Sequence, residues 1–344
     1  MASPPNPVGR AVVIIAVTFT FIDLVFIALR LWARRLKIVK LDASDYLIVA
    51  AWLLALADMV RKVVAAGWGV GVHFDELVAA IGFSTLTRIN KITFSGFFLW
   101  LAIVSLTKLS ILFLYRTLFR CMTRFIVVVH IMMSIVALYW IGFTLGSIFQ
   151  CKPVAFNWDK TIPGGTCLNP KSGFLTSGSV NLVLDVILVV MPAPVVWKMQ
   201  HVSQLKKIGI TTMFSLGLIV CFLAGFRFKF VLATDIADFN HDGEVAGIPG
   251  ELELYLGIIG ACLPLISPPL LAISQKVQSG YSSFVGRRRP GYAESSSDVV
   301  TFPKDEDSVV EVGPLKRSNV AEIDEHTIQC HSEWIVKSET RSDV

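Results

Sequence analysis

The stretch Phe94–Arg124 places the strongest constraint on the fold of this chain. From Phe94 to Tyr115 the only charged residue is Lys108. A helix of about 20 apolar residues spans a bilayer core roughly 30 Å thick, so this run is long enough to cross a membrane. A basic cluster follows directly and consists of Arg116, Arg120 and Arg124. Since such clusters indicate the cytoplasmic side, the stretch predicts a membrane helix, its direction and a buried lysine that needs a partner.

The composition of the whole chain agrees with this interpretation. Of 344 residues, 54% are hydrophobic and 17% are charged, below the usual quarter of a soluble protein. The sequence therefore indicates a polytopic membrane protein whose main partner is the lipid bilayer. The net charge of +5 is spread over short loops, where it acts as an orientation signal, and no nucleic-acid partner is expected.

Apolar runs of similar length recur along the chain, and we expect seven spans, over residues 11–32, 46–66, 94–115, 125–149, 173–196, 208–231 and 251–274. The predicted fold class is all-α: a seven-transmembrane-helix bundle over residues 1–275. Residues 276–344 are rich in serine and charge, and we expect a disordered cytoplasmic tail because they offer little apolar surface to bury.

Local signals refine two of these boundaries. Asp45 or Ser44 is expected to cap the second span. The glycines of Gly67–His73 are expected to break the helix, and residues 74–91 to form a short interfacial helix that can run straight into the third span.

The distribution of Lys and Arg predicts the topology. Loops 33–45, 116–124 and 197–207 are basic, whereas 232–250 carries neither residue; loops 67–93 and 150–172 are ambiguous. The balance places the N-terminus outside or in a lumen and the C-terminus in the cytosol. Cys151 and Cys167 then lie on the oxidising side, and we expect a disulfide between them, with two free thiols as the alternative.

Charged residues inside the spans are the candidate functional residues. A charge at the bilayer centre costs at least about 2.5–3.5 kcal/mol, so it usually faces the bundle interior and has a partner. Asp23, Lys108 and Asp185 lie at similar depths, and we expect Lys108 to pair with Asp185 or Asp23. Asn181 lies one helical turn before Asp185 on the same face. A structural ion pair is favoured over a binding or proton-handling site.

A second group of charges is expected nearer the outer surface. It consists of Asp58, Arg61, Lys62, Arg227, Lys229, Glu251 and Glu253. Charges of both signs at one level suggest an outward-opening vestibule between helices, which could take a small hydrophobic ligand. The alternatives are ion pairs within one helix surface and snorkelling to the interface.

A series of short motifs occurs in a characteristic order. They are Asp45-Tyr46, Gly69-x-Gly71-x-His73, Lys108-x-Ser110, Leu114-Tyr115-Arg116, Cys151, Trp158, Cys167, Asn181, Asp185 and Pro192-x-Pro194 with Trp197. In this order they resemble the fungal rhodopsin-domain integral membrane proteins, a family that includes the satratoxin-cluster membrane protein type and is related to fungal non-classical receptor-like proteins. The resemblance covers about residues 10–275 and implies a seven-helix fold.

The resemblance leaves several functions open. Some members look like sensors of the G-protein-coupled-receptor type, and others sit in secondary-metabolite gene clusters. Retinal would need a lysine on the seventh span, and 251–274 has none, so no cofactor is expected. His73 beside glycines is expected to be a loop-packing residue rather than a metal ligand.

We therefore expect an accessory or sensing membrane protein of a mycotoxin-type biosynthetic cluster. One alternative is a receptor-like sensor of a small ligand with a cytoplasmic signalling partner. The other is an intramembrane, cyclase-like enzyme, for which Asp23, Asp58 and Asp185 would be the acid–base candidates. An enzyme is disfavoured because nothing else in the sequence completes a catalytic set.

Overall fold

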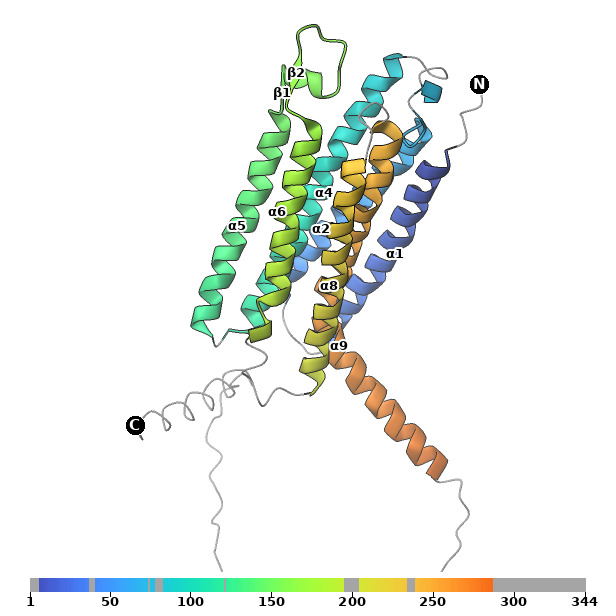
Figure 1. Cartoon of the computed structure of the whole chain (residues 1–344). Helices are drawn as coiled ribbons and strands as arrows, with labels where there is room; N and C mark the ends of the chain where they lie inside the picture. The colour runs from blue at the N-terminus through green and yellow to red at the C-terminus, as the bar shows by residue number, and fades with distance from the viewer. Residues whose placement is uncertain are drawn as a thin grey trace, which may run out of the picture. The chain divides into compact units, whose positions relative to one another are not determined.

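The computed structural model describes residues 6–36, 41–73, 75–77, 83–120, 122–194, 204–233 and 239–286. Most of these residues are helical. The long helices are α1 (Pro7–Leu36), α2 (Ala43–Gly67), α4 (Phe83–Leu118), α5 (Thr123–Ile148), α6 (Pro170–Val190), α8 (Gln204–Ala233) and α9 (Phe239–Gly286). Within residues 1–279 they run alongside one another and alternate in direction (Figure 1).

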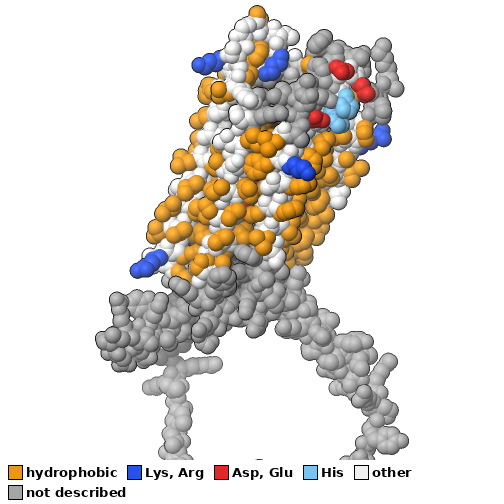
Figure 2. Space-filling view, in the orientation of Figure 1, with side chains coloured by type: hydrophobic (Ala, Val, Ile, Leu, Met, Phe, Trp, Pro, Cys, Tyr) orange, Lys and Arg blue, Asp and Glu red, His pale blue; other side chains and the backbone are white. Residues whose placement is uncertain are grey.

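Six of the described helices are long and apolar enough to cross a membrane. The segments are Pro7–Arg35, Leu86–Leu118, Thr123–Ile148, Ser172–Val190, Ser215–Leu232 and Asn240–Ile266. Large hydrophobic side chains point outward from them, and Figure 2 shows such side chains spread over the middle of the described bundle. A surface of this kind suits lipid rather than water, so the prediction of a helical membrane protein with several crossings is confirmed.

Helix α2 is not among those six, and its buried face carries charged residues. It packs against α1 and α4, and it buries Asp58 and Lys62 together with small and aliphatic residues. Helix α4 is the most buried of the six apolar spans, which places Lys108 in the interior of the bundle. The core around it includes Ile48, Leu101, Ile103, Leu112, Val129, Leu184 and Ile258.

The cap of α2 is one place where the expectation was wrong. Asp42, not Ser44 or Asp45, is the N-cap residue, and its side chain accepts a 2.8 Å hydrogen bond from the Ala43 N–H. Asp45 completes the capping box by accepting from the Asp42 N–H at 3.1 Å. Asp45 therefore supports the cap from the third helical position through Oδ2, and its Oδ1 remains available to another partner.

The last helix also begins earlier than expected. Helix α9 starts at Phe239, so most of the predicted loop 232–250 is helical. The early start is fixed by the Asn240 side chain, which donates to the carbonyls of Gly69 (3.1 Å) and Val72 (2.6 Å). At its other end α9 reaches Gly286, so the first residues of the predicted disordered tail are helical too. Residues 287–344 lie outside the described part of the chain.

Other expectations about the elements agree with the structure or fall outside it. From residue 83 onward the predicted interfacial helix runs straight into the third predicted span as one helix, α4, whereas residues 74 and 78–82 of the prediction lie outside the described residues. The basic loop expected over 197–207 is described only from residue 204, and residues 234–238 of the acidic loop are likewise not described.

The segment between α5 and α6 forms a small folded loop. Strands β1 (Cys151–Lys152) and β2 (Thr166–Cys167) pair antiparallel, with Cys151 opposite Cys167, and a disulfide joins these two cysteines. A 3-10 helix, η1 (Val154–Asn157), lies between the strands. The hydroxyl and the N–H of Thr161 donate to Asp159, which lowers the pKa of that carboxyl.

Candidate functional site

Lys108 forms an ion pair with Asp185 in the interior of the bundle. Its ammonium donates to Asp185 Oδ1 at 2.5 Å, linking α4 to α6. The exposed fractions of the two side chains are 5% and 13%. Of the two partners that the sequence left open, the structure thus brings Asp185 to Lys108.

Two further helices join this pair through amide and carboxylate groups. The Asn181 side chain donates to Asp185 Oδ2 at 3.3 Å and also to Glu253 on α9. Beside Glu253, the Arg227 guanidinium of α8 lies 4.5 Å above the centre of the Trp100 ring. We call these five polar residues the Lys108 cluster: Lys108, Asn181, Asp185, Arg227 and Glu253. Two cations and two carboxylates make the cluster neutral overall.

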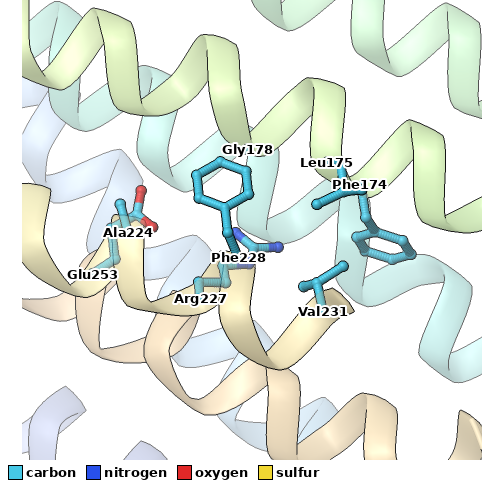
Figure 3. Close-up of a pocket in the computed structure, with 8 residues that line it drawn as sticks. All are labelled: Phe174, Leu175, Gly178, Ala224, Arg227, Phe228, Val231 and Glu253. Carbon is cyan, nitrogen blue, oxygen red and sulfur yellow. The ribbon is translucent and has the colours of Figure 1, made fainter. Parts of the chain in front are cut away.

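A small pocket opens beside the Lys108 cluster, between α6 and α8 (Figure 3). Its free volume is about 10 Å³, which is room for about one water molecule. Arg227 and Glu253 supply its charged lining. The remaining lining is apolar and consists of Phe174, Leu175, Gly178, Ala224, Phe228 and Val231.

A second set of charges, the Asp58 cluster, joins α2 to α9. It consists of Asp58, Arg61, Lys62 and Glu251. Asp58 lies 2.7 Å from Arg61 Nε and 2.9 Å from Lys62 Nζ, and Lys62 also contacts Glu251. Gly96 on α4 makes room for the guanidinium, because a Cβ there would lie 2.5 Å from Arg61 Cζ.

The structure pairs most of the charges that were expected to line a vestibule. The charges predicted to line it divide between the Asp58 and Lys108 clusters, while Lys229 is exposed on α8. Oppositely charged side chains pack directly against one another, and the space left beside Arg61, Lys62 and Glu244 is again about 10 Å³.

A third set, the Arg30 cluster, was not predicted as a site. It consists of Arg30, Arg34, Ser44 and Asp45. Arg30 is fully buried and donates to Asp45 Oδ1 (2.9 Å), to Ser44 Oγ (3.0 Å) and to the Ala261 carbonyl (2.6 Å). Arg34 takes the other carboxylate oxygen of Asp45 at 2.7 Å. The sequence did show Arg30 interrupting an apolar run, which could have marked the site. Its partners could not be identified in this way, because they lie on other helices.

Asp23, a predicted intramembrane charge, lies outside these three clusters. Its side chain is fully buried, and neither carboxylate oxygen has a hydrogen-bond partner among the described residues. The hypothesis of a Lys108–Asp23 pair is therefore wrong.

The glycine–histidine motif is a packing element. Gly69 and Gly71 have φ angles of +99° and +95°, which side chains other than glycine rarely adopt. The Gly71 N–H donates to the Asn240 carbonyl at 3.2 Å, and the His73 ring stacks on His241 with ring centres 4.0 Å apart. The motif thus holds the start of α9 against the end of α2.

Apolar helices that enclose paired charges define a multi-pass helical membrane protein. Its sequence matches the model of the Fungal rhodopsin domain over residues 29–272. The chain belongs to this family, as the order of its motifs predicted.

Several related proteins extend this result. The chain is 29% identical over 317 residues to the polyenoic acids biosynthesis gene cluster protein Ba17b of Metarhizium anisopliae, covering 84% of this chain and 81% of the relative. It is 31% identical over 201 residues to a SAT4 family membrane protein of Emericella nidulans, covering 58% and 49%. It is 24% identical over 277 residues to phomoidride biosynthesis cluster protein H of Fungal sp. (strain ATCC 74256), covering 74% and 86%.

Proposed function

We propose that this protein is an accessory membrane protein of a fungal secondary-metabolite pathway. The observation that carries the proposal is the similarity, over most of both chains, to a relative named for a polyenoic acid biosynthesis cluster. Relatives named for phomoidride, fugralin and wortmanamide clusters support it. Because these names specify different products, the shared role would serve the pathway rather than one chemical step.

The proposal includes seven crossings, with α2 as the additional span. Its 25 residues would extend about 38 Å, more than the bilayer core of roughly 30 Å. The Asp58 cluster pairs its charged residues internally, which removes much of the cost of placing them in lipid.

The proposed orientation puts the N-terminus outside or in a lumen. Helix α1 ends with Arg34 and Arg35, and Arg116 and Arg124 lie at the same end of the bundle, on α4 and α5. The disulfide loop lies at the opposite end (Figure 1). The positive-inside rule and the oxidising lumen both support this arrangement.

Within this framework, the Lys108 cluster would fix the relative positions of α4, α6, α8 and α9. Four helices contribute to one neutral network, in which Lys108 pairs directly with Asp185 and Asn181 joins Asp185 to Glu253. A structural role is therefore favoured over proton handling, as the sequence suggested.

Deletion of the gene followed by metabolite and transcript profiling tests the accessory role. We expect less end product, no accumulation of a single intermediate, and unchanged transcripts of neighbouring biosynthetic genes. Loss of those transcripts would instead support a sensor, and one accumulated intermediate would support an enzyme. An unchanged metabolite profile would remove the proposal.

Complementation then connects the phenotype to the structure. The wild-type gene should restore the product, whereas Lys108→Met should restore it poorly because the four-helix network is broken. Leu138→Ala is the matched control, since this side chain is 69% exposed on α5.

A further inference from the structure

The pocket beside the Lys108 cluster has unsatisfied polar atoms. Arg227 and Glu253 line this pocket. Arg227 Nη1 and Glu253 Oε2 are buried, and neither atom has a hydrogen-bond partner among the described residues. The Glu253 side chain is only 3% exposed. Buried polar atoms without partners are costly, so a group from outside the chain is expected to pair with them.

The charge balance limits what that group can be. Lys108 and Arg227 offset Asp185 and Glu253, so an ionised ligand would leave a net charge in a site of low polarity. The free atoms are one donor, on Arg227, and one acceptor, on Glu253. A hydroxyl group is neutral and satisfies both, because it accepts from the guanidinium and donates to the carboxylate.

The apolar lining limits the rest of the molecule. Phe174, Phe228 and Val231 are partly exposed on the α6–α8 side of the bundle and line the pocket together with Arg227 and Glu253 (Figure 3). Helix α8 is the least buried of the six apolar spans, so this side faces lipid. A lone water would find two polar partners here, the minimum for a buried water.

The depth of the pocket also fits an amphiphile. Gly178 lies six residues inside the span Ser172–Val190, about 9 Å along the helix axis. Arg227 lies five residues from the end of the span Ser215–Leu232, about 7.5 Å. Both positions lie in the outer third of their spans, so the hydroxyl of a membrane-dissolved alcohol can reach them from just below the headgroups.

We infer that this pocket binds a lipid-soluble alcohol: a neutral molecule with one hydroxyl between Arg227 and Glu253 and an apolar body against Phe174, Phe228 and Val231. The molecule can come from the membrane, as a sterol, or from the pathway, as a long-chain alcohol. This inference does not depend on the proposed role in a metabolite pathway. The two can be tested separately, because binding is measured on purified protein.

Photolabelling in lipid nanodiscs tests the site. The probes are a diazirine-bearing sterol and a diazirine-bearing hexadecanol, each compared with its methyl ether, and labelled peptides are located by mass spectrometry. We expect an alcohol to label residues 174–178 or 227–231, and its ether to label them about 10-fold less, because the ether cannot donate to Glu253. Stronger labelling by the sterol assigns the source to the membrane, and stronger labelling by hexadecanol assigns it to aliphatic products.

Substitutions at a lining glycine provide the structural control. A Cβ at Gly178 would lie 3.6 Å from Phe228, an ordinary contact, so Gly178→Ala fits and narrows the pocket, while Gly178→Leu fills it. Gly173→Leu, on the same helix with nothing within 4 Å of the added Cβ, is the matched variant. Labelling should fall stepwise from wild type to Gly178→Ala to Gly178→Leu and persist in Gly173→Leu. Equal labelling by alcohol and ether, or labelling that Gly178→Ala and Gly178→Leu leave unchanged, would show that only water or bulk lipid occupies the pocket.

Discussion

Replacement of Lys108 should destabilise the bundle by leaving a carboxylate without its cation. In Lys108→Met, Asp185 keeps only the 3.3 Å hydrogen bond from Asn181, and Glu253 adds a second negative charge nearby. Removal of one partner from a buried pair costs about 3–5 kcal/mol. Asp185 retains 13% exposure, so we expect the lower end, about 3 kcal/mol.

This free-energy loss is large enough to measure as a thermal shift. For a domain of this size, 1 kcal/mol corresponds to roughly 2–4 °C, so Tm of the purified protein in detergent should fall by roughly 6–12 °C. Asp185→Leu alone should cost a similar amount, because it leaves Lys108 buried and unpaired.

The double variant Lys108→Met/Asp185→Leu separates the pair from the packing of its carbon atoms. An apolar pair of similar volume can replace a buried ion pair at little cost, so we expect stability within about 1 kcal/mol of wild type. If the two single losses instead add in the double variant, Lys108 and Asp185 do not stabilise the fold as a pair, and the reasoning fails.

Three further predictions address other parts of the bundle. Arg30→Met should lower stability by about 3–5 kcal/mol in the same thermal assay, because it leaves the Asp45 carboxylate facing a single arginine. Gly71→Ala should cost about 1–3 kcal/mol because of its positive φ, whereas Gly67→Ala, with nothing within 4 Å of the added Cβ, should be nearly neutral; equal losses would contradict this. Cys151→Ser should cost about 2–4 kcal/mol, and non-reducing mass spectrometry of the wild type should show Cys151 linked to its partner; two free thiols would refute the bond.

Much of the fold could be predicted because lipid imposes a simple length rule. Long apolar runs mark spans, and the matching depths of Lys108 and Asp185 made their pairing a natural hypothesis. The start of α9 could not be predicted, because it depends on Asn240 contacting a loop some 170 positions earlier in the chain, at Gly69. Local composition carries no signal for such a contact.

The pairing of the outer charges could not be predicted for a related reason. Residue depth shows that charges lie at one level, but not which helices are neighbours. Whether opposite charges leave space or neutralise each other depends on those neighbours: Lys62 meets Glu251, while Glu253, two residues later, meets Asn181. Two glutamates that lie two residues apart on α9 thus belong to different clusters.

The loop that carries Gly69 and Gly71 connects the first helix to the last. The Asn6 side chain donates to the Val70 carbonyl at 2.7 Å. The Asn240 side chain donates to the carbonyls of Gly69 and Val72 in the same loop. A bulky protein fused directly before Asn6 would compete with this contact and loosen α9 from a distance. Reporter and purification tags for this protein are therefore better not fused directly before Asn6, where they would disturb these hydrogen bonds.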